Sequence, residues 1–296
     1  MAIETLPEPS LPITTPLRPR FGFLTSTPII ATATICLGLI IASAILAPLI
    51  SPHDPLLLAP AQRLKPANAQ FLLGTDAFGR DVLSRLLYGG RVSLVIGIGA
   101  AICSIAAGLL IGLVSGFFKW FDAVLMRIMD GLMAIPSVLL AIAVISLSGA
   151  TVSTVLVAIT IPEVPRVARL VRSVVLSARE EPYVEAAISV GSSLPKIMWR
   201  HLMPNTIAPL IVQGTYVCAS AILTEAILSF LGAGISPETP TWGNMMADGR
   251  AFFLIKPSLI FWPGLLLSIA ILSINLIGDA ARDALDPRMQ QREGGK

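Results

Sequence analysis

Residues 92–118 read VSLVIGIGAAICSIAAGLLIGLVSGFF and contain no charged side chain. A helix needs about 20 consecutive apolar residues to cross the hydrocarbon core of a bilayer, where unpaired backbone groups are costly. This stretch is long enough to cross with some tilt. Residues 29–50, 206–224 and 257–278 are also free of charge and qualify in the same way. These four stretches predict an all-α membrane protein.

Composition supports the same class. The chain is 54% hydrophobic and 13% charged, whereas soluble domains contain roughly 25% charged residues. A net charge of +3 is too small to indicate a nucleic-acid partner. Cys36, Cys103 and Cys218 each lie in an apolar stretch, so they resemble small buried hydrophobic residues rather than disulfide partners or a metal site.

The number of crossings depends on residues 131–162, which are mostly apolar. This stretch would be about 48 Å long as a helix, too long for one crossing and too short for two. A turn at residues 148–149 gives two spans if the flanks are included, 124–147 and 152–171. The predicted total is about six transmembrane helices, of which the fourth is the weakest.

Lengthening these spans brings Asp130, Glu163 and Arg166 to the membrane ends. Charges near the bilayer usually face protein or water rather than lipid. We expect Glu163 and Arg166 at the inner end of the fourth span, and snorkelling to the interface is an equally open alternative.

Basic residues set the predicted orientation. Six lie between the fourth and fifth spans, and both tails contain arginines. An even number of crossings places these three regions on one side, which the positive-inside rule assigns to the cytoplasm. The loop at residues 51–91 also contains five basic residues but must lie outside, and its three aspartates partly offset that charge.

The inner loop contains the most informative segment, EEPYVEAAISVG at residues 180–191. Pro182 suits the first turn of a helix, and Gly191 is placed to end it. Ser193 can cap a second short helix, and Pro204 would separate that helix from the fifth span. The pattern predicts a compact helix-turn-helix on the cytoplasmic face.

Glu185-Ala186-Ala187, followed by Gly191 and by His201-Leu202-Met203-Pro204, resembles the EAA loop of binding-protein-dependent ABC importers. In that family the loop forms a coupling helix that docks in a cleft on the ATPase subunit. The resemblance implies that Glu185 makes the polar contact, that Ala186 and Ala187 permit close packing, and that Gly191 supplies the turn. The alternative is an ordinary amphipathic loop helix.

Further segments resemble the C-type permease of dipeptide and oligopeptide importers, so the similarity runs from about Gly74 to Arg288. Glu163-Val164-Pro165 before Arg166 departs from it, because an aromatic or small residue is expected there. The charges of the first segment are expected to be structural ties, with Thr75 or Asp76 capping a turn. The segments are LGTDAFGRDVLSR (73–85), EAILSFLG (225–232), WGNM (242–245) and GDAARDALDPR (278–288).

The resemblance implies a type I ABC importer permease fold in a bacterial inner membrane, with both termini cytoplasmic. It also implies a second homologous permease, two ATPase subunits and a periplasmic solute-binding protein as partners. The resemblance implies a division into a cytoplasmic tail (1–28), a first transmembrane helix (29–50), a periplasmic loop (51–91), a permease core (92–280) and a second cytoplasmic tail (281–296). The periplasmic loop would contain a short interfacial helix near residues 82–88. The core would contain five transmembrane helices and the coupling loop at about 172–204.

Three polar residues in or near the spans are candidates for the pathway or the outer face. Glu225 lies about 30 Å along its helix from Asn205, so it is expected near the outer surface. It could meet the binding protein or the solute, but pairing with an arginine of the outer loop is the favoured reading. Gln213 and Asn275 could line the pathway or link helices through hydrogen bonds.

No phosphate-binding Gly-x-x-x-x-Gly-Lys-Ser/Thr loop is present, so ATP and Mg²⁺ are expected on the partner ATPases and no catalytic, cofactor or metal site is expected here. A stand-alone secondary transporter would need mid-membrane ion-coupling residues and related halves, and neither is evident. A membrane scaffold would leave the loop resemblance unexplained. Short peptides are the favoured solute, with glutathione, murein peptides or a nickel chelate as alternatives.

Overall fold

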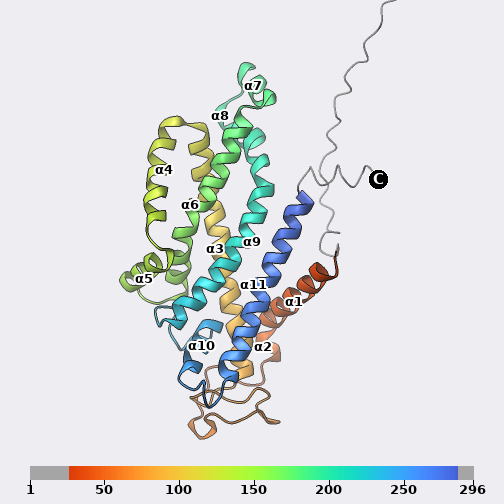
Figure 1. The fold of residues 1–296 in the computed structure, drawn as a ribbon, viewed down its shortest axis with the longest axis vertical. Helices are drawn as coiled ribbons and strands as arrows, with labels where there is room; N and C mark the ends of the chain where they lie inside the picture. Colours follow the sequence, from red (N-terminus) through yellow and green to blue (C-terminus); the bar gives the residue numbers. More distant parts are fainter. Residues whose placement is uncertain (1–26, 286–296) are drawn as a thin grey trace, which may run out of the picture.

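Helices account for most of residues 27–285, the part of the chain that this computed structural model describes (Figure 1). No strand forms within that range, apart from an isolated bridge between Thr75 and Asp81, so the all-α prediction is confirmed. The predicted N-terminal tail and most of the C-terminal tail lie outside the described residues. The helices are α1 (Pro28–Ile45), α2 (Ala47–Ile50), α3 (Val82–Phe117), α4 (Lys119–Ala134), α5 (Ser137–Ser148), α6 (Val152–Arg179), α7 (Pro182–Ser189), α8 (Leu194–Ile197), α9 (Met203–Phe230), α10 (Trp242–Arg250) and α11 (Ser258–Leu285).

The most extensive helix packing in the described chain is between α3 and α6, which run in the same direction. Glycines spaced four residues apart on α3 face valines spaced four apart on α6. A Cβ atom added at Gly108 would lie 2.5 Å from the Cβ of Val167, and one at Gly112 would lie 2.5 Å from the Cβ of Val171. Small residues allow such close backbone approach, which provides the van der Waals contact that joins helices in lipid.

Among the described residues, four helical stretches are long and apolar enough to cross a membrane: α1, α3, residues 194–230 and α11. The helices α4 and α5 qualify only as a pair bent by 92°. The predicted span at 124–147 is therefore not one continuous helix but is broken between α4 and α5. Proline disfavours a helical conformation in the residue before it, and Ile135, which precedes Pro136, has an extended ψ of 129°.

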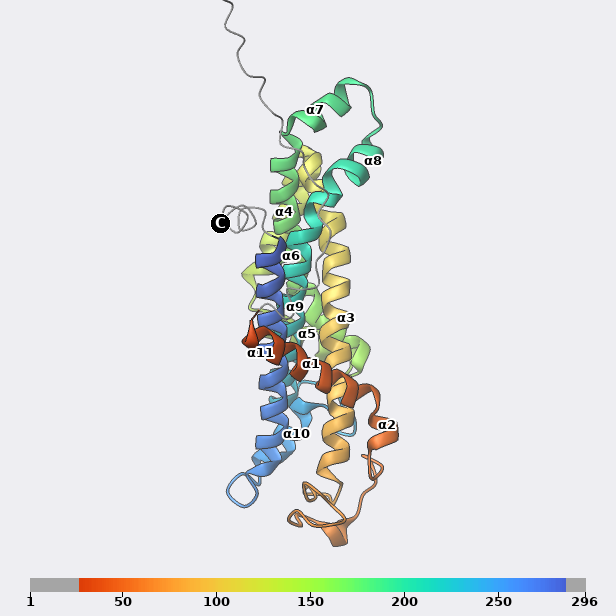
Figure 2. The ribbon, with the colours of Figure 1, turned by 90° about the vertical axis from the view of Figure 1, so that its right-hand side faces the viewer.

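The predicted fourth span corresponds to α6, which begins at Val152 as expected but continues to Arg179. Because α6 contains charged residues, it is not among the four stretches that are apolar enough to cross a membrane, yet it lies along α3 in both views (Figures 1 and 2). The Arg179 Nη1 group donates to the Phe117 carbonyl over 3.2 Å and joins the inner ends of the two helices. Because α3 and α6 run in parallel, the α4–α5 pair must return across the membrane between them. The described helices thus agree with about six crossings.

At the outer end, α3 begins directly after Asp81, whose Oδ2 accepts a hydrogen bond of 3.0 Å from the Ser84 amide. The expected interfacial helix at 82–88 is thus the first part of α3. Asp76 caps the preceding turn, as expected, by accepting hydrogen bonds from the amides of Phe78 and Arg80 over 2.8 and 2.9 Å. Helix α1 crosses α11 and α3 at a steep angle (Figure 2).

Candidate functional site

The predicted inner helix is present as α7, which begins at Pro182 and projects beyond the spans at the top of Figure 1. Gly191 ends it with φ of +77°. The Gly191 amide donates to the Ile188 carbonyl over 2.9 Å, and the Ser192 amide donates to the Ala187 carbonyl over 3.0 Å. This pair of bonds is a Schellman motif, whose left-handed residue is usually glycine because a Cβ there costs roughly 1–2 kcal/mol.

The second short helix, α8, also begins where expected, after Ser193, although the Ser193 side chain makes no capping bond. The expected break at Pro204 is absent. Residues 198–202 form a π-helical turn, and α8, this turn and α9 form one continuous helical stretch. Pro204 lies in the first turn of α9, where its missing N–H group is tolerated because the wider turn has just changed the hydrogen-bond register.

Buried side chains attach this helix pair to the spans. Val184 of α7, Ile197 of α8 and Leu202 of the π turn are at most 1% exposed and belong to the apolar cluster that includes Val175 of α6. The Asn205 side-chain amide also donates hydrogen bonds to the Tyr183 hydroxyl (3.0 Å) and to the His201 carbonyl (2.6 Å). The α7–α8 unit therefore has a fixed orientation on the spans.

The opposite side of this unit has no partner among residues 27–285. Glu185 and Ala186 are exposed, and Ala187 is half-buried. Val190 is 86% exposed and Trp199 is 71% exposed. Apolar side chains beyond the membrane spans, mixed with an acidic residue, are typical of a protein-interaction surface. We refer to these five residues together with Ile188 and Leu194 as the coupling surface.

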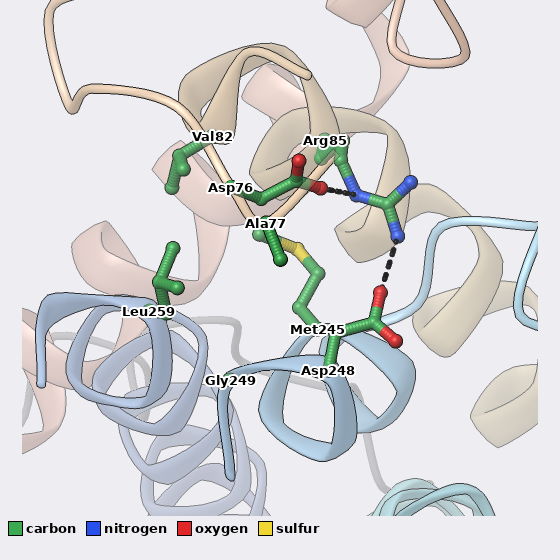
Figure 3. Close-up of a pocket in the computed structure, with 8 residues that line it drawn as sticks. All are labelled: Asp76, Ala77, Val82, Arg85, Met245, Asp248, Gly249 and Leu259. Atoms are coloured by element: carbon green, nitrogen blue, oxygen red, sulfur yellow. Dashed lines mark hydrogen bonds and ion pairs between the residues drawn. The ribbon is translucent and has the colours of Figure 1, made fainter. Parts of the chain in front are cut away.

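The outer end contains a buried ionic cluster that joins residues far apart in the chain. The Arg80 Nε atom lies 2.6 Å from Asp76 Oδ2, and its Nη2 atom lies 2.9 Å from Asp248 Oδ2. Arg85, 1% exposed, lies 3.7 Å from Asp76 and 3.5 Å from Asp248 (Figure 3). Burial raises the pKa of the Asp248 carboxyl, and the two arginines oppose that shift. The outer segment is tied to α3 and α10 by these charges, as expected from the sequence.

The cavity beside this cluster has a volume of about 10 Å³, room for one water at most, and is not a solute site. The Lys256 ammonium, whose pKa burial lowers, strengthens the tie by donating to the Thr75 carbonyl over 2.8 Å and to the Lys65 carbonyl. Neither Asp248 nor Lys256 stood out in the sequence, since their partners lie more than 150 residues away along the chain.

Glu225 does not reach the arginines of the outer loop. It is fully buried, accepts hydrogen bonds from the hydroxyls of Ser93 (3.2 Å) and Ser229 (2.8 Å), and has Thr241 as a further hydrogen-bonding neighbour. The expected arginine pairing is wrong, because α10 and its N-cap Thr241 pack against α9 and cover this carboxylate. Burial also removes Glu225 from any solute or binding-protein contact in this conformation.

The WGNM segment is a structural clamp near Glu225. The Trp242 indole N–H donates to the Leu86 carbonyl over 3.1 Å. The side-chain amide of Asn244 lies within hydrogen-bonding distance, 3.0 to 3.2 Å, of three carbonyls of the preceding loop, to which it donates. These bonds hold α10 against α3 and close the loop that follows α9.

Glu163 and Arg166 are not at the inner end of the fourth span but near the middle of α6. The packing of α6 against α3 places Glu163 there, because the α3 glycines contact α6 at positions four to twelve residues after Glu163, toward the inner end. The Arg166 Nη1 atom lies 2.8 Å from Glu163 Oε1, which also accepts a hydrogen bond of 3.2 Å from Ser220 of α9. Arg169 pairs with Asp130 of α4 at 2.6 Å.

The two remaining pathway candidates differ in exposure. Gln213 of α9 is half-buried and Asn275 of α11 is exposed. Neither side chain makes a hydrogen bond to another described residue, so neither links helices within the described part of the chain.

Comparison with known proteins identifies the family. Residues 104–291 match the family described as binding-protein-dependent transport system inner membrane component. A probable peptide ABC transporter permease of Sinorhizobium fredii is 51% identical over 84% of this chain and 85% of its own length. A dipeptide transport system permease of Alkalihalophilus pseudofirmus is 39% identical over 96% and 94%. A glutathione transport system permease of Pectobacterium atrosepticum is 38% identical over 85% and 84%.

A solved inward-facing structure of the MetNI methionine ABC transporter shares the fold. Its matched chain has a TM-score of 0.54 and 19% identity, over 68% of this chain and 97% of that chain. The α-helical architecture is therefore that of a type I importer permease. The chain belongs to the family of binding-protein-dependent transport system inner membrane components.

Proposed function

We propose that this chain is a permease subunit of an ATP-driven importer that moves short peptides into the cytoplasm across a bacterial inner membrane. It would pair with a second homologous permease, with two ATPase subunits on the cytoplasmic side, one of them against the coupling surface, and a periplasmic solute-binding protein at the outer end. ATP and Mg²⁺ would bind the ATPases. The observation that carries this proposal is the coupling surface, which is fixed to the spans by buried contacts and has no partner in the part of the chain that the structure describes.

ATP-dependent closure of the ATPases would move α7 and α8, and their buried contacts would pass that motion to α6 and α9. Rigid elements that rock between two packed states are the usual basis of such a transition. Glu185 would provide the polar contact, and Ala186 and Ala187 would permit close approach. Gly191 would fix the turn between α7 and α8.

A peptide solute is supported by the relatives, which are peptide and dipeptide permeases, and the glutathione permease at 38% identity supports glutathione as the second candidate. A stand-alone secondary transporter receives less support. The spans do contain ionisable residues at mid-depth, namely Glu163 and Arg166, but these pair with each other rather than forming an open ion site.

The direct test is co-purification. The chain is tagged at its C-terminus, native membranes are solubilised gently, and bound proteins are identified by mass spectrometry. We expect a second permease, ATPases and a solute-binding protein, whose ligand can then be screened for. Recovery of this chain alone, under conditions where a known ABC complex survives, would refute the importer proposal.

A further inference from the structure

A polar stripe runs along the facing sides of α6 and α9 from mid-membrane to the cytoplasmic end. On α6 it comprises residues spaced three or four apart, which share one helix face. On α9 the members are eleven residues, or three turns, apart and so also share a face. We call this stripe the polar seam; its members are Arg166, Arg169, Ser173, Ser177, Asn205 and Tyr216.

Contacts at both ends show that the two stripes face the same space. At mid-depth, Ser220 of α9 donates to Glu163 of α6 over 3.2 Å. At the cytoplasmic end, Ser173 and Ser177 of α6 line an open groove of about 450 Å³ together with Asn205 of α9. From Arg166 to Ser177 the seam is about 17 Å long at 1.5 Å per residue.

The charges of the seam exclude lipid as its neighbour. The side chains of Arg166 and Arg169 are 39% and 45% exposed, whereas that of Glu163 is 6% exposed. An arginine exposed to hydrocarbon is costly, so these side chains must face water or protein. Other sides of α9 have a different character, since Ile207 and Ile211 expose about half of their surface.

Water suits the seam better than a packed subunit interface. Arg166 is already neutralised by Glu163, and Arg169 by Asp130. Neither guanidinium group therefore needs a counter-charge from a second chain, but both retain exposed donors that need hydrogen-bonding partners. The groove at the inner end would connect these donors to the cytoplasm.

We propose that the polar seam lines the inner half of the solute pathway as a water-filled cleft, in which Arg166 faces the carboxylate groups of the passing solute. This inference rests on the proposed function and adds a specificity-determining residue to it. A guanidinium group binds carboxylates strongly through paired N–H donors. Its bond to Glu163 would moderate that affinity, so that a solute can enter and also leave.

Cysteine labelling tests the water-filled cleft without knowledge of the solute. In a chain whose native cysteines are replaced by alanine, cysteine is introduced at Tyr216 or at Ile211, which are 52% and 47% exposed on α9. Ser173→Cys and Ile207→Cys form a second pair. Native membranes containing the full complex are treated as inside-out vesicles with a membrane-impermeant maleimide.

We expect the seam cysteines to react at least about tenfold faster than the isoleucine-site cysteines, because the reactive thiolate forms in water and not in lipid. Equal rates would overturn the proposal. So would seam cysteines that stay unlabelled but form disulfides with a second permease, since the seam would then be an interface. Loss of ATPase co-purification would instead refute the importer proposal, which separates the two failures.

The role of Arg166 is tested by reagent charge. Ser173→Cys lies about 10 Å from Arg166 along α6, and a unit charge at that distance in water changes the ratio of anionic to cationic methanethiosulfonate labelling about fourfold. We expect Arg166→Gln to lower this ratio by about that factor and Arg166→Lys to preserve it. If Arg166→Gln fails to fold, Glu163→Gln with Arg166→Gln avoids the unpaired carboxylate and should also lower the ratio. An unchanged ratio in the neutral variants, or an equal fall in Arg166→Lys, would overturn the assignment.

Discussion

Replacing Gly191 with proline should separate the ATPases from the membrane subunit while leaving membrane insertion intact. Proline fixes φ near −65°, whereas Gly191 has φ of +77°. The change also removes the 2.9 Å bond from the Gly191 amide to the Ile188 carbonyl and disfavours the conformation of the C-cap residue Val190, which has φ of −79° and ψ of 2°. One lost hydrogen bond and one misplaced left-handed residue together cost about 3 kcal/mol.

That amount is enough to unfold the last turn of α7, which has only eight residues, without unfolding the spans. Gly232 provides a matched control. It has φ of +79° and nothing within 4 Å of its added Cβ, and the Gly232 and Ala233 amides make the same pair of bonds at the outer end of α9. Gly232→Pro therefore introduces the same local strain at the opposite end of the molecule.

The assay is the amount of ATPase that co-purifies with equal amounts of tagged permease, together with ATP-dependent uptake in the same cells. We expect Gly191→Pro to lose most of both and Gly232→Pro to retain ATPase binding. Normal uptake by Gly191→Pro would refute the reasoning. Equal loss of ATPase in both variants would also refute it, because the effect would then reflect general instability.

Three further substitutions test the packing. Arg85→Leu should destabilise the chain by about 3 kcal/mol by leaving the buried Asp76 and the partly buried Asp248 with too few cations, measured as a lower melting temperature in detergent. Gly112→Val should destabilise the chain by about 1–3 kcal/mol and so lower its melting temperature, because the added Cβ would overlap α6. An unchanged melting temperature would argue against the α3–α6 contact. Glu225→Ala should cost about 1–3 kcal/mol by leaving buried hydroxyls unpaired, whereas Glu225→Gln should cost less and both should retain ATPase binding.

Local features were predictable because their causes are local. Pro182 and Gly191 mark the start and end of α7 through backbone conformation alone, and charge-free stretches mark four of the spans by length. The bend between α4 and α5 also has a local cause in Pro136, but the apolar composition of this stretch led to the prediction of a single span. The family resemblance then supplied the meaning of the α7–α8 unit, which composition alone does not.

Long-range features were not predictable in the same way. Apart from Ser229 on its own helix, the partners of Glu225 lie on α3 and at the start of α10, and nothing in the local sequence selects them over the outer-loop arginines. The depth of Glu163 depends on the register between α3 and α6. A usable signal was present in the spacing of Gly108, Gly112 and Gly116, which indicates a close helix contact but not its partner.

The measurement that most directly tests the central claim is photo-crosslinking from a benzoyl-phenylalanine at Val190, with the same probe at Leu254 as the control. Both positions are almost fully exposed, at 86% and 95%, but Val190 follows α7 at the inner end and Leu254 follows α10 at the outer end (Figure 1). The coupling surface predicts a crosslink to an ATPase subunit from Val190 and none from Leu254. An ATPase crosslink from Leu254, or none from Val190 in an intact complex, would contradict the account.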